Sequence, residues 1–145
     1  MLLDAGFGVQ SSDLLEGTGT GFGGLNLGIG GFIREDMALW FRAAGTTVKQ
    51  DGGILGDIDA ISGVGGIAAQ YWTNDNINLE GGIGLGFADL SVGGSESGFG
   101  LLLGAGYSFW NNGKHSLQFG GQYTPAFLDG VTFHNVSITF GWQLL

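Results

Sequence analysis

Long stretches of strict alternation constrain the fold of this chain more than any other feature. Over residues 77–89 nearly every second residue is large and apolar, and those between are mostly glycine, asparagine or glutamate. A side-chain period of two is typical of a β-strand, whose successive residues point to opposite faces. The same pattern recurs over 21–33 and 131–144. Glycine, 32 of 145 residues, also disfavours helix, by roughly 1 kcal/mol each relative to alanine.

The whole chain predicts about eight strands of ten or more residues, longer than most strands of soluble sheets. They are expected near residues 2–11, 21–33, 37–49, 62–73, 77–89, 98–110, 115–126 and 131–144. The connections at 34–36, 74–76 and 111–114 are short and polar, whereas most of the others are longer or rich in glycine. Short turns at one end and longer loops at the other are typical of an outer-membrane barrel.

Aromatic side chains gather beside the short turns and near the C-terminal end of the chain. Aromatic residues collected at one end of alternating strands indicate a ring at a membrane–water interface. We therefore expect an interfacial aromatic rim made of Trp40, Tyr71, Trp72, Trp110 and Trp142. Strict alternation along the third strand, however, turns Trp40 inward.

Alternation alone does not say which face of the sheet is outside. A soluble, lipocalin-like carrier of an apolar ligand would turn the apolar face inward. Charged residues, however, are only 12% of the chain, against about a quarter in soluble domains. The apolar faces are also long enough to cover a hydrocarbon band of about 25 Å. We therefore expect leucine, isoleucine, valine and phenylalanine toward lipid, with glycine, asparagine, glutamine and serine inside, and keep the carrier as an alternative.

Composition and charge narrow the remaining classes. The chain has no cysteine, which excludes disulfides and thiolate metal sites, and no run of about 18 apolar residues that would predict a transmembrane helix. A formal charge of −9 argues against nucleic acid as a partner. The first residues lack the basic and apolar segments of a signal peptide, so we expect an exported protein in its mature form with an added methionine.

The segments at 70–75 (Gln-Tyr-Trp-Thr-Asn-Asp) and 133–142 are typical of one class of membrane protein. In their pattern the chain resembles the eight-stranded outer-membrane barrels of Gram-negative bacteria, of the OmpA/OmpX type. The resemblance spans nearly the whole chain and is one of architecture, without a diagnostic motif. It implies an all-β fold, a closed antiparallel up-and-down transmembrane β-barrel forming a single domain over 1–145. Such barrels usually end in an aromatic residue, and this chain departs from them by ending in Leu145.

Three charged residues fall on the predicted inward face, close to the short-turn end: Asp4, Arg42 and Glu80. An unpaired charge inside a barrel is costly, so Arg42 should hold at least one carboxylate. We interpret the three residues as a lumen charge network that plugs the barrel. The alternative is a gate or ion-selective constriction. The predicted function is accordingly a structural role or a narrow, largely plugged, porin-like pore.

The other candidate sites are weaker. Asp57 and Asp59, in an acidic loop, are possible ligands of a divalent cation, but no regular calcium-loop motif surrounds them. A lipid-modifying outer-membrane enzyme is a further alternative, which we do not favour. The spacing puts His134 and Ser137 on opposite faces of one strand, so they should not form a catalytic pair.

We expect no cofactor and no enzymatic activity. The expected partners are outer-membrane lipid or lipopolysaccharide, replaced by detergent in vitro. The protein is expected to be a monomer.

Overall fold

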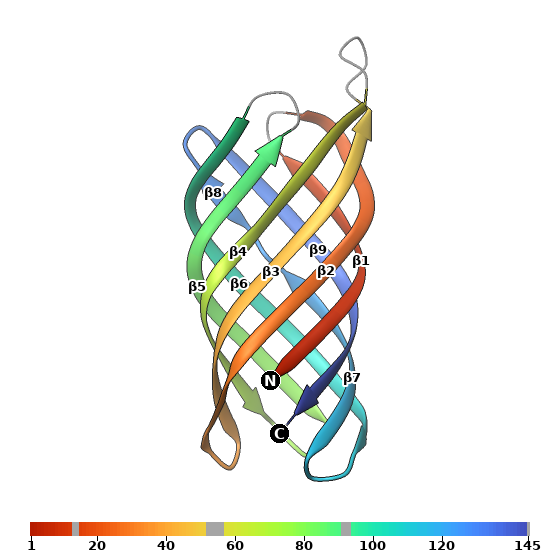
Figure 1. Cartoon of the computed structure of the whole chain (residues 1–145), viewed down its shortest axis with the longest axis vertical. Coiled ribbons are helices and arrows are strands. Elements are labelled where there is room, and N and C mark those ends of the chain that lie inside the picture. The colour runs from red at the N-terminus through yellow and green to blue at the C-terminus, as the bar shows by residue number, and fades with distance from the viewer. Residues whose placement is uncertain (13–14, 52–56, 91–93, 145) are drawn as a thin grey trace.

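The chain forms one closed antiparallel β-barrel in a computed structural model that describes residues 1–12, 15–51, 57–90 and 94–144 (Figure 1). The strands are β1 (Leu2–Ser12), β2 (Leu15–Arg34), β3 (Met37–Asp51), β4 (Asp57–Trp72), β5 (Ile77–Leu90), β6 (Gly94–Asn111), β7 (His115–Tyr123), β8 (Ala126–Leu128) and β9 (Val131–Leu144). Strands β1 to β7 pair in chain order, and β1 also pairs with β9, which closes the sheet. The predicted all-β, up-and-down barrel is confirmed.

The nine segments make a ring of eight strands, because β7 and β8 are two parts of one interrupted strand. Both pair with β6 on one side and with β9 on the other. The interruption is at Thr124 and Pro125, inside the strand predicted over 115–126. Proline has no N–H to give to a neighbouring strand. Its carbonyl still accepts a hydrogen bond from the Leu101 N–H at 3.0 Å, so the two parts stay in line.

Several strands begin or end farther toward the long-loop end than predicted: β2 starts at Leu15 rather than near residue 21, and β4 at Asp57 rather than near 62. Figure 1 shows these strands rising at the end opposite the two termini. The added residues of β2, at 15–20, read Leu-Glu-Gly-Thr-Gly-Thr and lack apolar alternation. Apolar alternation indicates a strand only where one face is buried and the other contacts lipid. These extensions lack the alternation and were therefore not predicted as strand.

The barrel exterior is apolar across the middle of the sheet. Leu85 is 72% exposed, Phe41 67% and Ile29 66%, whereas the alternate positions, such as Asn26 and Asn78, are buried. A soluble carrier would need the opposite arrangement, with the apolar side chains around an internal ligand. Exposed leucine, isoleucine and phenylalanine on all sides of a closed barrel are stabilised by contact with lipid.

Among the described residues, the structure contains no helix with the length and apolar character needed to cross a membrane.

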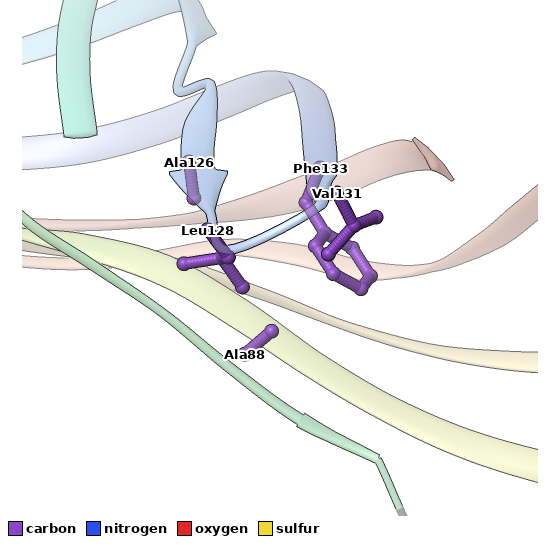
Figure 2. Packing of buried hydrophobic residues seen from close by; sticks show 5 residues of the cluster. All are labelled: Ala88, Ala126, Leu128, Val131 and Phe133. Atoms are coloured by element: carbon purple, nitrogen blue, oxygen red, sulfur yellow. The ribbon is translucent and has the colours of Figure 1, made fainter. Parts of the chain in front are cut away.

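The interior differs from the prediction at the long-loop end. We expected small and polar residues inside, but an apolar cluster fills the lumen there, and we call it the apolar cap. Figure 2 shows its side chains, from β5, β8 and β9, gathered in one place. Its members are Ala88, Ala126, Leu128, Val131 and Phe133. Phe133, the largest, is 2% exposed.

Candidate functional site

The charged residues of the lumen meet at one level, nearer the short-turn end. Asp4 lies on β1, Arg42 on β3 and Glu80 on β5, so β2 and β4 separate them along the barrel wall. Arg42 Nη2 lies 3.5 Å from Asp4 Oδ2, and Arg42 Nε lies 3.2 Å from Glu80 Oε1. All three side chains are 4–6% exposed. The guanidinium therefore bridges two carboxylates across the interior, and we call the three residues the charge cluster.

Glycines on neighbouring strands provide the space for this cluster. Gly141 of β9 is the register partner of Asp4, and a Cβ atom at Gly141 would collide with Asp4 Oδ1. Gly28 of β2 is the register partner of Arg42, and a Cβ there would lie 3.0 Å from Arg42 Cδ. These inward-facing glycines therefore make room for charged side chains. They are one reason why the barrel needs so much glycine.

Side-chain amides that were not predicted from the sequence extend the charge cluster toward the short-turn end. Gln118 donates from Nε2 to Asp4 Oδ1 at 3.3 Å, and accepts at Oε1 a bond of 3.2 Å from Asn78 Nδ2. Asn78 in turn accepts a bond of 3.1 Å from Gln70 Nε2. Each of these amides is buried. Their only sequence signal was a polar residue at an inward position, which does not reveal partners across the lumen.

Trp40 corrects one part of the predicted aromatic rim. Its side chain is 1% exposed and lies inside the barrel, packed with Leu2 and Ala38. Its indole Nε1 donates to Gln70 Oε1 at 3.2 Å, and Gln143 Nε2 donates to the same oxygen at 2.9 Å. The strict alternation of β3, rather than proximity to a turn, decides where this tryptophan points. Trp40 therefore occupies the barrel interior and is not an exposed side chain of the rim.

The other four aromatic residues of the predicted rim divide into two groups. Tyr71 and Trp110 are exposed on the outside, at 48% and 46%. Trp142 is half-buried and stacks on His115, with ring centroids 5.5 Å apart. Trp72 is also half-buried. It occupies an inward-facing position at the end of β4, where it lines a hollow at the barrel mouth. The anchoring role of these side chains at a membrane interface stays a prediction.

The space left beside the charge cluster is small. A cavity of about 30 Å³ is lined by charged and amide side chains and by glycines of β6 and β7. That volume holds about one or two water molecules. Nearer the long-loop end, the Ser62 hydroxyl of β4 donates to Asn135 Oδ1 of β9 at 2.9 Å. This bond joins two strands that are not adjacent in the sheet. Side chains therefore fill most of the described interior.

The predicted metal ligands cannot be placed as side chains. Asp57 and Asp59 belong to β4 by their backbone, and pair in register with Asp51 and Lys49. Their side chains lie outside the described part of the structure. Within the described part, no group of three or more histidine, aspartate or glutamate residues is arranged to hold a metal ion.

The histidine of the enzyme alternative has a partner other than serine. The Tyr123 hydroxyl and His134 Nδ1 lie 2.7 Å apart, within hydrogen-bonding distance, and the two rings are nearly parallel. Ser137 is 5% exposed and faces the lumen, whereas His134 and Tyr123 are half-buried at outward positions. The expected separation of His134 from Ser137 is therefore observed.

No family model matches the chain, and no curated protein matches it. Solved structures do share its fold. Neisserial surface protein A is 18% identical, with a TM-score of 0.64, and the alignment covers 99% of this chain and 94% of that one. The attachment invasion locus protein Ail of Yersinia pestis is 21% identical, with a TM-score of 0.61 and coverage of 97% and 93%. The outer membrane protein OprG from Pseudomonas aeruginosa is 16% identical, with a TM-score of 0.54 and coverage of 97% and 93%.

These likenesses are ones of fold. They agree with the eight-stranded ring and with the OmpA/OmpX-type architecture. Together with the apolar exterior, they point to the bacterial outer membrane as the place where the barrel resides.

Proposed function

With the fold of an eight-stranded outer-membrane barrel as the premise, we propose that this protein has a structural role in the membrane, with a lumen that is at most a narrow, largely plugged pore. The observation that carries the proposal is the filled interior. An eight-stranded barrel is just wide enough for its side chains to occupy the lumen. Here the charge cluster leaves about 30 Å³, too little for an ion with its hydration shell.

Two barriers of different chemistry stand in series along the lumen. The first is the bridge from Asp4 through Arg42 to Glu80, which crosses the interior. The second is the apolar cap. Its members have no polar side chain that could replace the water around an ion. Hydrophobic constrictions exclude ions because such a passage is dry. Opening one barrier would therefore leave the other in place.

Conductance across a planar lipid bilayer tests the proposal. We expect purified native barrel to give no steady current, and Glu80→Ala or Phe133→Ala to stay closed. The double variant Glu80→Ala/Phe133→Ala should conduct, because it weakens both barriers. A large, stable conductance of the native protein would contradict the structural role. Lack of current in the double variant, once shown to be folded, would mean that other side chains close the lumen.

A gated narrow pore is the second candidate, and the position of Arg42 favours it. Arg42 contacts two carboxylates at similar distances of 3.2 and 3.5 Å, so a small shift would release one and keep the other. In that case Glu80 is the gate. Glu80→Ala alone should then raise the conductance, and an unchanged current in this variant would count against a gate at this position.

A further inference from the structure

With both of its carboxyls ionised, the charge cluster carries a net charge of its own. Asp4 and Glu80 together carry two negative charges when ionised, and Arg42 supplies one positive charge. Among the described residues that face the lumen there is no second lysine or arginine. Arg34 is 71% exposed and pairs with Asp36, and Lys114 is exposed in a short turn. A net negative charge in an interior shielded from water is costly unless a bound cation or a proton balances it.

The place where such a cation would lie is already formed. The 30 Å³ cavity borders both carboxylates and the Arg42 side chain, as well as the side chains of Gln118, Gln122 and Thr139. Glu80 Oε1 is buried and touches Arg42 Nε, but among the described residues it receives no hydrogen bond of good geometry. Carboxylate and hydroxyl oxygens are ligands that hard cations prefer, and here Asp4, Glu80 and Thr139 supply them. The amide oxygens of Gln118 and Gln122 already accept bonds from Asn78 and Asn26.

We infer that the lumen beside Asp4 and Glu80 is a binding site for one small monovalent cation of the size of Na⁺. One positive charge completes the balance of two carboxylates and one guanidinium, whereas a divalent ion would leave an excess of positive charge. Mg²⁺ also keeps several waters at strict octahedral positions, and the cavity has space for only one or two. Choline is too large to enter.

This site belongs to the charge cluster that also serves as a barrier in the proposed function. The two ideas are nevertheless separable. A barrel can be closed to current whether or not an ion is trapped in it, so the cation site is tested by stability and binding, without a measurement of conductance.

The test is the thermal unfolding midpoint of the native barrel in detergent, followed by its mobility in SDS gels or by circular dichroism. Midpoints are compared across a series of NaCl concentrations and in choline chloride at equal ionic strength. We expect the midpoint to rise with Na⁺ and to saturate, because an ion that binds only the folded state stabilises it. Glu80→Gln should abolish the difference between the two salts, since Asp4 and Arg42 then balance each other. Asp129→Asn, at an exposed turn, should retain it.

Equal midpoints in Na⁺ and choline would overturn the inference. So would a Na⁺ response that persists in Glu80→Gln, because the ion would then be bound elsewhere, or a midpoint that responds to acid and not to Na⁺, because a proton would then be the occupant. The ²³Na resonance of the native protein provides a test that does not depend on folding of a variant. We expect line broadening that excess Mg²⁺ does not remove; complete removal would place the Na⁺ among the exposed carboxylates and overturn the inference.

Discussion

At the short-turn end of the lumen, Arg42 bridges two carboxylates at 3.2 and 3.5 Å, while at the long-loop end Phe133 packs among four smaller apolar side chains. The first arrangement is directional, because each charge needs a partner at one position. The second is not, because any apolar group of suitable volume can fill the space. The comparison shows that the interior of one narrow barrel is filled in two ways, and the two should respond differently to the loss of a single side chain.

The largest effect is expected for Arg42→Ala. The substitution leaves both Asp4 and Glu80 without their guanidinium partner, and breaking a buried ion pair from one side costs about 3–5 kcal/mol. We expect a loss of about 5 kcal/mol in the free energy of unfolding, measured by urea titration in lipid vesicles. Arg34→Ala is the matched control, because its ion pair with Asp36 is largely exposed and worth little. Similar losses in both variants would show that the charge cluster does not hold the strands together.

A smaller effect is expected at the apolar cap. Phe133→Ala removes a ring that is 2% exposed, and substitutions of this kind cost about 3–5 kcal/mol, depending on how far the surroundings collapse. We expect about 3 kcal/mol in the same titration, because the short β8 segment can move inward. Phe140→Ala, a phenylalanine on the outside of the same strand with 54% exposure, is the control. If Phe133→Leu recovers most of the loss, the cap depends on volume alone, as the comparison requires.

The smallest effect is expected at the glycine that accommodates Asp4. Gly141→Ala places a methyl group against the Asp4 carboxylate, and overpacking of this kind costs about 1–3 kcal/mol. We expect the free energy of unfolding to fall by about 2 kcal/mol, measured again by urea unfolding. Gly121→Ala is the control, because a Cβ atom there meets nothing within 4 Å. The double variant Gly141→Ala/Asp4→Ala should lose less than the sum of the single changes; strict additivity would contradict the proposed collision.

Much of the fold could be predicted from the sequence, because lipid on one side and a filled lumen on the other impose a period of two. The inward positions of Asp4, Arg42 and Glu80 follow from that period, and the expense of a buried charge predicts their pairing. The identity of the amide that binds Asp4 cannot be predicted from that period. Gln118 is 114 positions away in the chain, and only the register of a closed ring brings it near.

The apolar cap was missed for a related reason. Val131 and Phe133 share the inward face of their strand with Asn135, but a valine or phenylalanine looks the same in the sequence whether it meets lipid or lumen. The break at Pro125 was missed because Tyr123 and Thr124 before it and Phe127 after it continue to favour a strand. Proximity to a turn misled the placement of Trp40, whereas alternation predicted its direction correctly.

The pairing of β1 with β9 has a consequence for the order of assembly. Contacts between β3 and β5, including that of Arg42 with Glu80, become possible as soon as the first five strands are present. The second support of Asp4, from Gln118, needs the seventh strand, and the seam along β1 needs the last one. Closure of long chain loops costs entropy before its contacts are made, and makes folding slow. One edge of the N-terminal strand can pair with β2 at once, whereas the other must wait for the end of the chain, and the Asp4 carboxylate is enclosed only when the ring closes.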